Sequence, residues 1–437
     1  MAVRVPACSR VVGQTRVMGR SEVVAGGRLT DWISLGVLAS WVPADAVDEA
    51  VEVTGKAARR RGGKLPPRVT AYLVMALALF ADEDYEEVAA RLAGTLADWG
   101  GWEGSWGAVP TSGGVAQARQ RLGAEPMREL FSRVAAPVGD VATAGAFLGR
   151  WRLMSIDGTE WDVPATPANA AFFGFTGTGK DGVPGSFPKA RVVTVAECCS
   201  HAPVLAAVGP CASKGSGEQS LARRLYPRLE GDWLLIADRN FYSWQDWRAA
   251  AGTGAALLWR VKADVGLPAL EVLPDGSYLS VLADPLVRKA ARARLLEAVR
   301  AGQDPGEGKA RRVRVIEYEV PDRDGGGKHE LVTLVTTITD FREAPAAALA
   351  AAYHERWEHE GAIAQLKTFL RGPGRILRSQ SPDMIEQEIW GYLLTHYAIS
   401  ALVCTAATAA GIDPDRVKFK RTVRAVRRRV ADPAFPP

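Results

Sequence analysis

Four polar residues in the last quarter of the chain are spaced to share one line along a helix. The segment 353–367 reads YHERWEHEGAIAQLK. At the rotation of an α-helix, Tyr353, Arg356, Glu360 and Lys367 fall within an arc of roughly 60°. A surface helix normally has a broad polar face and a broad apolar face. A phenol, a guanidinium, a carboxylate and an ammonium on one line indicate instead a carboxylate among phosphate-binding groups.

Two aspartates could join that carboxylate. Asp157 lies in SIDGT, late in an apolar segment, and Asp238 ends WLLIAD. Clustered carboxylates repel one another, and a divalent cation removes that cost. Mg²⁺ prefers oxygen ligands, and a pair of such ions can activate a nucleophile and stabilise a leaving oxygen in phosphodiester chemistry. Asp157, Asp238 and Glu360 are therefore candidate catalytic residues and Mg²⁺ ligands.

Each candidate also has a plainer interpretation. An aspartate after a strand is more often a turn former or a helix cap than a metal ligand. A single helical glutamate is usually solvated, and we expect this of Glu355 and Glu358. Asp162 competes with Asp157 for the first position. We prefer Asp157 because Asp162 comes later, in the extension toward Pro164.

The elements that would position these acids follow a recognisable order. Apolar segments and turn signals predict three strands at 152–163, 190–199 and 202–209, then a helix at 217–229, a strand at 233–238, a helix at 243–251 and a strand at 256–261. This is the element order of a ribonuclease-H-like α/β fold, in which a mixed sheet is flanked by helices. Its first strand lies beside its fourth, which would make Asp157 and Asp238 neighbours.

The remaining segments divide the chain further. We expect a flexible arm at 1–27, an N-terminal helical, DNA-binding domain at 28–145, the first part of the catalytic domain at 146–262, a β-rich insertion at 263–340, a second catalytic part with the Glu360 helix at 341–415 and a basic tail at 416–437. Arginines and lysines cluster at 59–64 and 416–429. Such clusters commonly face a polyanion, although a solvated surface is as consistent with either one alone.

The sequence disfavours several other kinds of site and of cellular location. The five cysteines form no C-x-x-C pair, so neither a zinc site nor a disulfide framework is expected. His354 and His359 have the wrong spacing for a zincin pair, and 174–180 (GFTGTGK) has the wrong spacing for a phosphate loop. We find no apolar run of membrane-spanning length and no signal-peptide pattern, and expect a soluble, intracellular protein.

The same residues resemble a known family. Tyr353, Arg356, Glu360 and Lys367 reproduce the Y-(2)-R-(3)-E-(6)-K signature of insertion-sequence-4 family DDE transposases. The segments around Asp157 and Asp238 are similar to that family's catalytic blocks, and the resemblance extends over nearly the whole chain.

The resemblance implies Mg²⁺-dependent cleavage at the inverted repeats of an insertion sequence and transfer of the 3′-hydroxyl ends into target DNA. It implies a pair of Mg²⁺ ions, replaceable by Mn²⁺, on Asp157, Asp238 and Glu360. It implies DNA contacts for Tyr353, Arg356 and Lys367. A homodimer synapsed on double-stranded DNA and a cytoplasmic, nucleoid-associated location also follow from it.

Two family features do not transfer. A tryptophan in the insertion would stack on a flipped base, but residues 263–340 contain none, and Trp259 lies just before them. We expect the helical C-terminal tail that serves dimerisation elsewhere in the family to be short or absent. Two other functions stay open at this point: a catalytically inactive, transposase-derived DNA-binding protein, and a Mg²⁺-dependent DNA nuclease without strand transfer.

Overall fold

A computed structural model describes most of the chain. The described residues are 36–58, 65–96, 109–176, 185–212, 215–303, 305, 309–321 and 329–429. The predictions for the arm at 1–27, the basic cluster at 59–64 and the end of the basic tail lie outside these residues.

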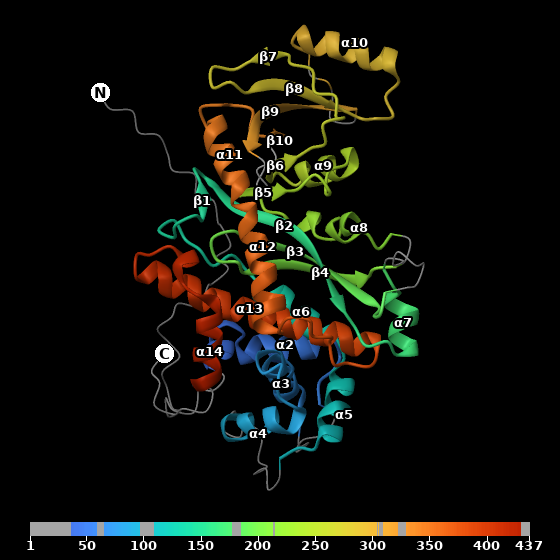
Figure 1. Cartoon of the computed structure of the whole chain (residues 1–437), viewed down its shortest axis with the longest axis vertical. Helices are drawn as coiled ribbons and strands as arrows, with labels where there is room; N and C mark the ends of the chain where they lie inside the picture. The colour runs from blue at the N-terminus through green and yellow to red at the C-terminus, as the bar shows by residue number, and fades with distance from the viewer. Residues whose placement is uncertain are drawn as a thin grey trace, which may run out of the picture.

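One mixed sheet runs through the molecule (Figure 1). Its ribonuclease-H-like part consists of β2 (Trp151–Asp162), β3 (Lys189–Glu197), β4 (Pro203–Pro210), β5 (Trp233–Ala237) and β6 (Ala256–Arg260), with β1 (Phe147–Leu148) paired to β2. The strand order is β4-β3-β2-β5-β6. β2 pairs antiparallel with β3 and parallel with β5. The predicted neighbourhood of the first and fourth strands, and with it the α/β fold class, is confirmed.

The insertion extends the same sheet. It contributes β7 (Glu271–Val272), β8 (Tyr278–Ala283), β9 (Ala310–Pro321) and β10 (His329–Thr336), and β10 pairs antiparallel with β6. It also contains a helix, α10 (Lys289–Arg300), that the sequence analysis did not predict. Leu295, Leu296 and Val299 recur at helical spacing and pack against β8 and β9. The described part of the insertion is therefore rich in strands, as predicted, and contains one helix in addition.

Because side chains alternate along each strand, the sheet has two faces, and each face packs in its own hydrophobic core. On β2, Met154 and Ile156 face one core together with α8 (Glu218–Ala222), the short helix Tyr226–Arg228 and α9 (Trp244–Ala251). Trp151 and Leu153 face the other core, against α11 (Ala346–His354). Since side chains alternate along a strand, Ser155 and Asp157 point to the same face as Leu153.

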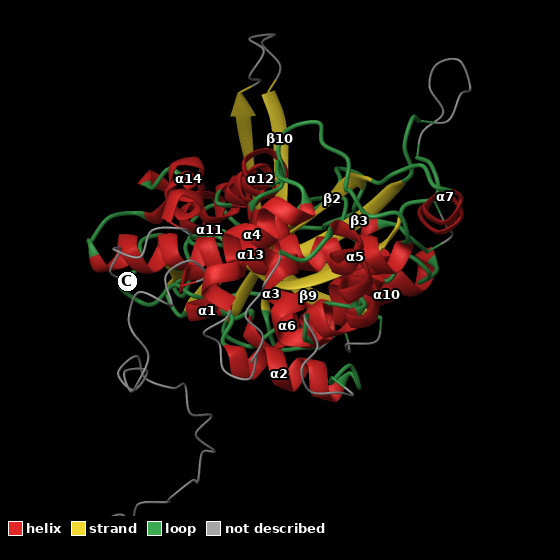
Figure 2. Ribbon diagram, turned by 90° about the horizontal axis from the view of Figure 1, so that it is seen from below, coloured by secondary structure: helices red, strands yellow, loops and turns green. Residues whose placement is uncertain are grey.

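The N-terminal region is helical, as predicted, but shares its core with the C-terminal helices. It contains α1 (Gly36–Trp41), α2 (Ala44–Val53), α3 (Pro67–Leu79), α4 (Tyr85–Leu96), α5 (Ser112–Leu122) and α6 (Glu125–Val134). Every residue of α3 from Val69 to Leu79 is buried. The reason is that α3 packs against α13 (Pro382–Ala409) (Figure 2).

Helix α13 corrects one expectation. By length and composition it could cross a membrane, so the sequence does contain an apolar run of that length. However, 83% of its most apolar window is buried inside the protein, against α3 and other elements of the shared core. α13 is therefore apolar because neighbouring elements surround it.

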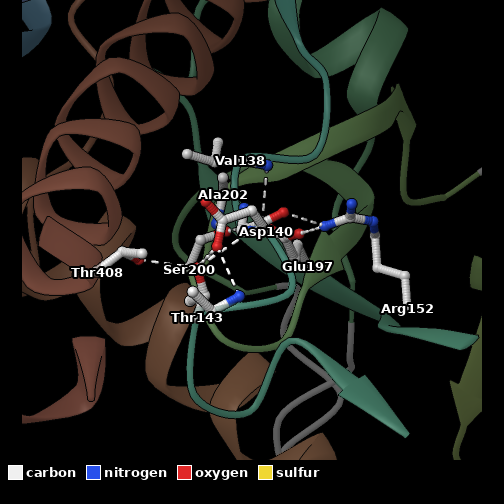
Figure 3. A network of polar contacts seen from close by, with 10 residues as sticks. Val138, Asp140, Thr143, Arg152, Glu197, Ser200, Ala202 and Thr408 are labelled. Atoms are coloured by element: carbon white, nitrogen blue, oxygen red, sulfur yellow. Dashed lines mark hydrogen bonds and ion pairs between the residues drawn. The ribbon is translucent and has the colours of Figure 1, made fainter. Parts of the chain in front are cut away.

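A buried carboxylate fixes the link between the helical region and the sheet (Figure 3). Glu197, at the end of β3, accepts hydrogen bonds from the backbone N–H groups of Val138 (2.9 Å) and Gly139 (3.0 Å) and from Ser200 Oγ (2.6 Å). It also pairs with Arg152 of β2. Its charge is thus compensated within the protein.

The helix predicted to carry the polar line is not continuous. α11 ends at His354, α12 spans Arg356–Ala364, and a π-helix follows at Gln365–Leu370. At the break the Glu355 N–H bonds the Ala352 carbonyl three residues earlier (3.1 Å). Lys367 therefore leaves the regular α-helical stripe that we assumed, because a π-helix turns less per residue.

Candidate active site

Asp157 and Asp238 lie side by side where the pairing of β2 with β5 ends. The last pair in the parallel β2–β5 register joins Ile156 to Ala237, and the two aspartates are the next residues. Neighbouring strands lie about 4.8 Å apart. Leu234 and Ile236 face the α11 core, so by alternation Asp238 points to that face as Asp157 does. The sheet thus brings together two carboxylates that are distant in sequence.

A buried histidine docks α12 over this edge. His359 Nδ1 lies 3.1 Å from the Ser155 carbonyl oxygen, and Nε2 lies 2.9 Å from Thr194 Oγ1. Burial lowers the pKa of His359 to about 3. The neutral imidazole donates from Nδ1 and accepts at Nε2, which fixes α12 against β2 and β3. Sequence reasoning had considered His359 only as a zinc ligand.

Arg356 lies between two of the predicted acids. Its Nη1 is 3.8 Å from Asp157 Oδ2, and its Nη2 is 3.3 Å from Glu360 Oε1. Its Nε is buried and has no acceptor among the described residues. The guanidinium is thus the cation shared by Asp157 and Glu360, and it keeps a free donor.

The electrostatics of Asp157 reflect this crowding. Burial raises the pKa of Asp157 to about 6, with smaller upward contributions from Glu218 and Glu360. The Gly158 N–H, 2.8 Å from Oδ1, and Arg356 oppose the rise in this pKa. A second cation at this place would favour the ionised form of Asp157.

Tyr353 joins the other aspartate. Its hydroxyl lies 3.5 Å from Asp238 Oδ1. Burial and the negative charge of Asp238 raise the pKa of Tyr353 to about 12, so the phenol keeps its proton and can donate it in a hydrogen bond.

Lys367 and Asp162 lie away from this group. Asp162 is the last residue of β2, and its Oδ1 pairs with Lys189 Nζ at 2.9 Å. Five residues of strand separate it from Asp157, a distance of about 16 Å. Burial and the nearby cations Arg371 and Lys189 lower the pKa of Lys367, and Asp162 opposes that change. The structure therefore places Lys367 near Asp162, and Asp157, not Asp162, beside Asp238.

Sequence reasoning missed a fourth carboxylate, Glu218 of α8. A Cβ built on Gly158 would lie 2.6 Å from Glu218 Oε1, so the Glu218 side chain occupies its present place only because residue 158 is a glycine. Glu218 and Asp238 also interact electrostatically. The one available signal was the glycine directly after the candidate aspartate.

The donor set fits a hard divalent cation. Asp157, Asp238 and Glu360 offer only carboxylate oxygens, the ligands that Mg²⁺ prefers. Among the described residues, the group with three ligand atoms within 4.8 Å of one another is a different one, made by His201, Glu358 and Asp415. The three predicted acids are spread more widely, with Arg356 between two of them.

The strand order and the adjacent Asp157 and Asp238 together define a ribonuclease-H-like protein with an acidic edge at these two residues. Comparison with known proteins identifies the family. Residues 32–132 match the family described as insertion element 4 transposase N-terminal, and residues 152–397 match the transposase DDE domain. The chain belongs to the insertion-element-4-type DDE transposases. Membership of this enzyme family implies a divalent metal cofactor.

A curated relative and a solved structure were also found. The chain is 27% identical over 373 residues to the transposase InsG for insertion sequence element IS4 of Escherichia coli (strain K12), which covers 84% of this chain and 77% of that protein. A cryo-EM structure of the piggyBac transposase synaptic complex with hairpin DNA aligns with a TM-score of 0.45 and 8% identity, over 92% of this chain and 80% of that one.

Proposed function

We propose that this transposase cuts DNA at the inverted repeats of an insertion sequence and joins the freed 3′-hydroxyl ends to target DNA. In this proposal Asp157, Asp238 and Glu360 hold a pair of Mg²⁺ ions, which Mn²⁺ can replace. The chemistry that these ions supply when bound is charge stabilisation at the attacking and leaving oxygens of a phosphodiester. The observation that carries the proposal is the meeting of β2, β5 and α12 at one acidic edge.

Arg356 and Tyr353 are proposed DNA contacts at that edge. Arg356 makes only long ion pairs of 3.8 and 3.3 Å and keeps an unpaired Nε, so its guanidinium can turn toward a phosphate oxygen. The protonated Tyr353 hydroxyl can donate to another. Lys367 would meet a phosphate further along the DNA.

The rest of the DNA surface is proposed to include the helical region and α14 (Phe419–Arg429). Phe419 and Val423 of α14 are buried, while Arg421, Arg424 and Arg428 are exposed. The predicted basic tail is therefore in part an anchored helix that presents cations to solvent. We further propose a cytoplasmic, nucleoid-associated protein that forms a homodimer on two DNA ends.

The cleavage test uses two supercoiled plasmids, with and without the repeats that flank the gene, in Mg²⁺ and in EDTA. We expect repeat-specific excision in Mg²⁺ only. Binding without cutting would support an inactive DNA-binding protein, and repeat-independent nicking would support a nuclease. The dimer is tested by analytical ultracentrifugation of the protein with repeat DNA; a complex with one protein chain on one DNA end would contradict it.

A further inference from the structure

Arg371 is a buried cation without sufficient acceptors. It directly follows the π-helix, where its N–H bonds the Leu366 carbonyl five residues earlier (3.1 Å). Its side chain leaves the residue only 6% exposed and stacks over Trp161, with 5.1 Å from Cζ to the ring centroid. Its Nε and Nη1 are buried and have no acceptor among the described residues. Burying donors without partners is unfavourable, more so when they are charged.

Two other buried arginines, in contrast, have a hydrogen-bond acceptor for every nitrogen of the guanidinium group. Arg119 bonds Gln387 Oε1 (2.9 Å), Tyr85 Oη and Ser379 Oγ (3.0 Å), one acceptor for each nitrogen.

Arg314 is satisfied in the same way. It bonds Ser277 Oγ (2.7 Å), the Ala344 carbonyl (2.6 Å) and Asp275. Arg371 differs from both because two of its nitrogens lack an acceptor among the described residues. A purely structural role therefore does not explain why a guanidinium group is buried at this position.

A second cation, Lys367, lies near Arg371. Lys367 is half-buried, and Arg371 and Lys189 both contribute to lowering its pKa, after burial itself. Lys189 is compensated, since it pairs with Asp162 (2.9 Å). Within the described part of the chain, neither Lys367 nor Arg371 has a carboxylate oxygen within 4.0 Å. Two partly desolvated positive charges that lack a direct ion pair within the described residues are a suitable environment for an anion.

We propose that Lys367 and Arg371 form a phosphate site in which Arg371 contacts a DNA backbone phosphate. This inference rests on the proposed function and adds Arg371 to its DNA contacts. Lys367, the more exposed of the two, meets the phosphate as a point charge, and the planar guanidinium of Arg371 offers two adjacent donors to its oxygens. The π-helix supports this assignment, because such segments are frequent at functional sites.

The test compares Arg371→Met with Arg119→Met in the full-length chain, in EDTA, with a duplex that lacks the repeats. A DNA-contacting Arg371 predicts that Arg371→Met retains the wild-type melting temperature or exceeds it, because a buried, poorly paired charge is removed. It also predicts a weaker salt dependence of DNA binding. The slope of the logarithm of the DNA association constant against the logarithm of the salt concentration should decrease in magnitude by about 0.9, the value for one phosphate contact. Arg119→Met should lower the melting temperature and leave the slope unchanged.

Inorganic phosphate provides a second arm. Phosphate should raise the melting temperature of the wild type above that in chloride at equal ionic strength, and this rise should be absent in Arg371→Met. If Arg371→Met does not fold, Arg371→Lys replaces it, and its phosphate-induced rise should fall below about half of the wild-type rise, because the planar fork is lost.

An unchanged salt slope in folded Arg371→Met, or a full phosphate response in Arg371→Lys, would overturn the inference. A phosphate response that depends on Arg371 without a change in the DNA slope would also overturn it, in favour of a free-phosphate site. None of these measurements requires cleavage, so a protein that binds DNA but does not cut would refute the proposed function alone.

Discussion

Two carboxylates of α12, two residues apart, have opposite surroundings. Glu358 Oε2 lies 2.9 Å from His201 Nε2, which is also 3.3 Å from Asp415 Oδ1, and the Gln365 amide lies 2.6 Å from the other nitrogen of that imidazole. Glu360, on the other side, shares Arg356 with Asp157, which in turn lies near Asp238 and Glu218. The first group contains its own cation, whereas the second has more carboxylates than the guanidinium beside them can balance. The difference supports the proposal that the Glu358 side of α12 serves structure and that the Glu360 side binds an external cation.

The largest expected effect comes from neutralising the carboxylate on each side of α12 in turn. Glu360→Gln should lower cleavage of repeat-bearing plasmid by about a thousandfold, because a metal ligand contributes several kcal/mol to stabilising the transition state. DNA binding, measured by gel shift, should persist. The matched control is Glu358→Gln, which should cleave within about tenfold of the wild type. Similar cleavage by both variants would remove Glu360 from the site.

A second variant tests a carboxylate whose charge is balanced by a cation of the protein itself, in contrast to the acids around Arg356. Glu197→Gln should destabilise the protein by about 2–4 kcal/mol, because it removes the charge that pairs with Arg152 and one acceptor of a buried network. Urea unfolding followed by circular dichroism measures this. A loss below about 0.5 kcal/mol would show that the network of Figure 3 contributes little to stability.

The His201 group makes a prediction about pH. Burial alone would lower the pKa of His201, but the hydrogen bonds to Asp415 and Glu358 outweigh burial and raise it from 6.5 to about 9. The stabilisation is complete below pH 6.5, where folded and unfolded chains are both protonated, and is lost as pH rises through 9.

His201→Asn tests this, since asparagine tolerates the left-handed backbone at this position (φ 59°). The variant should cost about 2 kcal/mol of unfolding free energy at pH 6 and much less at pH 9.5. An equal loss at both pH values would show that the imidazole contributes packing rather than charge.

The smallest effect is expected for Tyr353→Phe. The hydroxyl is at the limit of hydrogen-bond distance from Asp238, 3.5 Å. Its removal should reduce cleavage by less than about tenfold. A loss comparable to that of Glu360→Gln would place the hydroxyl in the chemistry itself.

The fold and part of the site could be predicted because they depend on local patterns. One apolar strand that contains Asp157 and another that is followed by Asp238, in the right element order, were sufficient to place the two residues side by side. α10 was missed because its apolar positions, Leu295, Leu296 and Val299, are few among charged residues. The interruption at Glu355 and the π-helix were missed because a regular 100° rotation was assumed.

Other features could not be predicted because they depend on tertiary contacts. His201, Glu358 and Asp415 come from three distant segments, and nothing in their local sequence indicates that they meet. Glu218 and Arg371 are similar cases: an acid beside Gly158 and an arginine over Trp161 are recognisable only once the strands and helices are packed.

The most direct test of the central claim is Mn²⁺ binding to the DNA-free protein, followed by electron paramagnetic resonance, in the wild type, Glu360→Gln and Glu358→Gln. We predict that Glu360→Gln weakens binding at least about tenfold, whereas Glu358→Gln binds as the wild type does. Loss of binding in Glu358→Gln with full binding in Glu360→Gln would contradict the account, because it would place the metal at His201 and Asp415 instead.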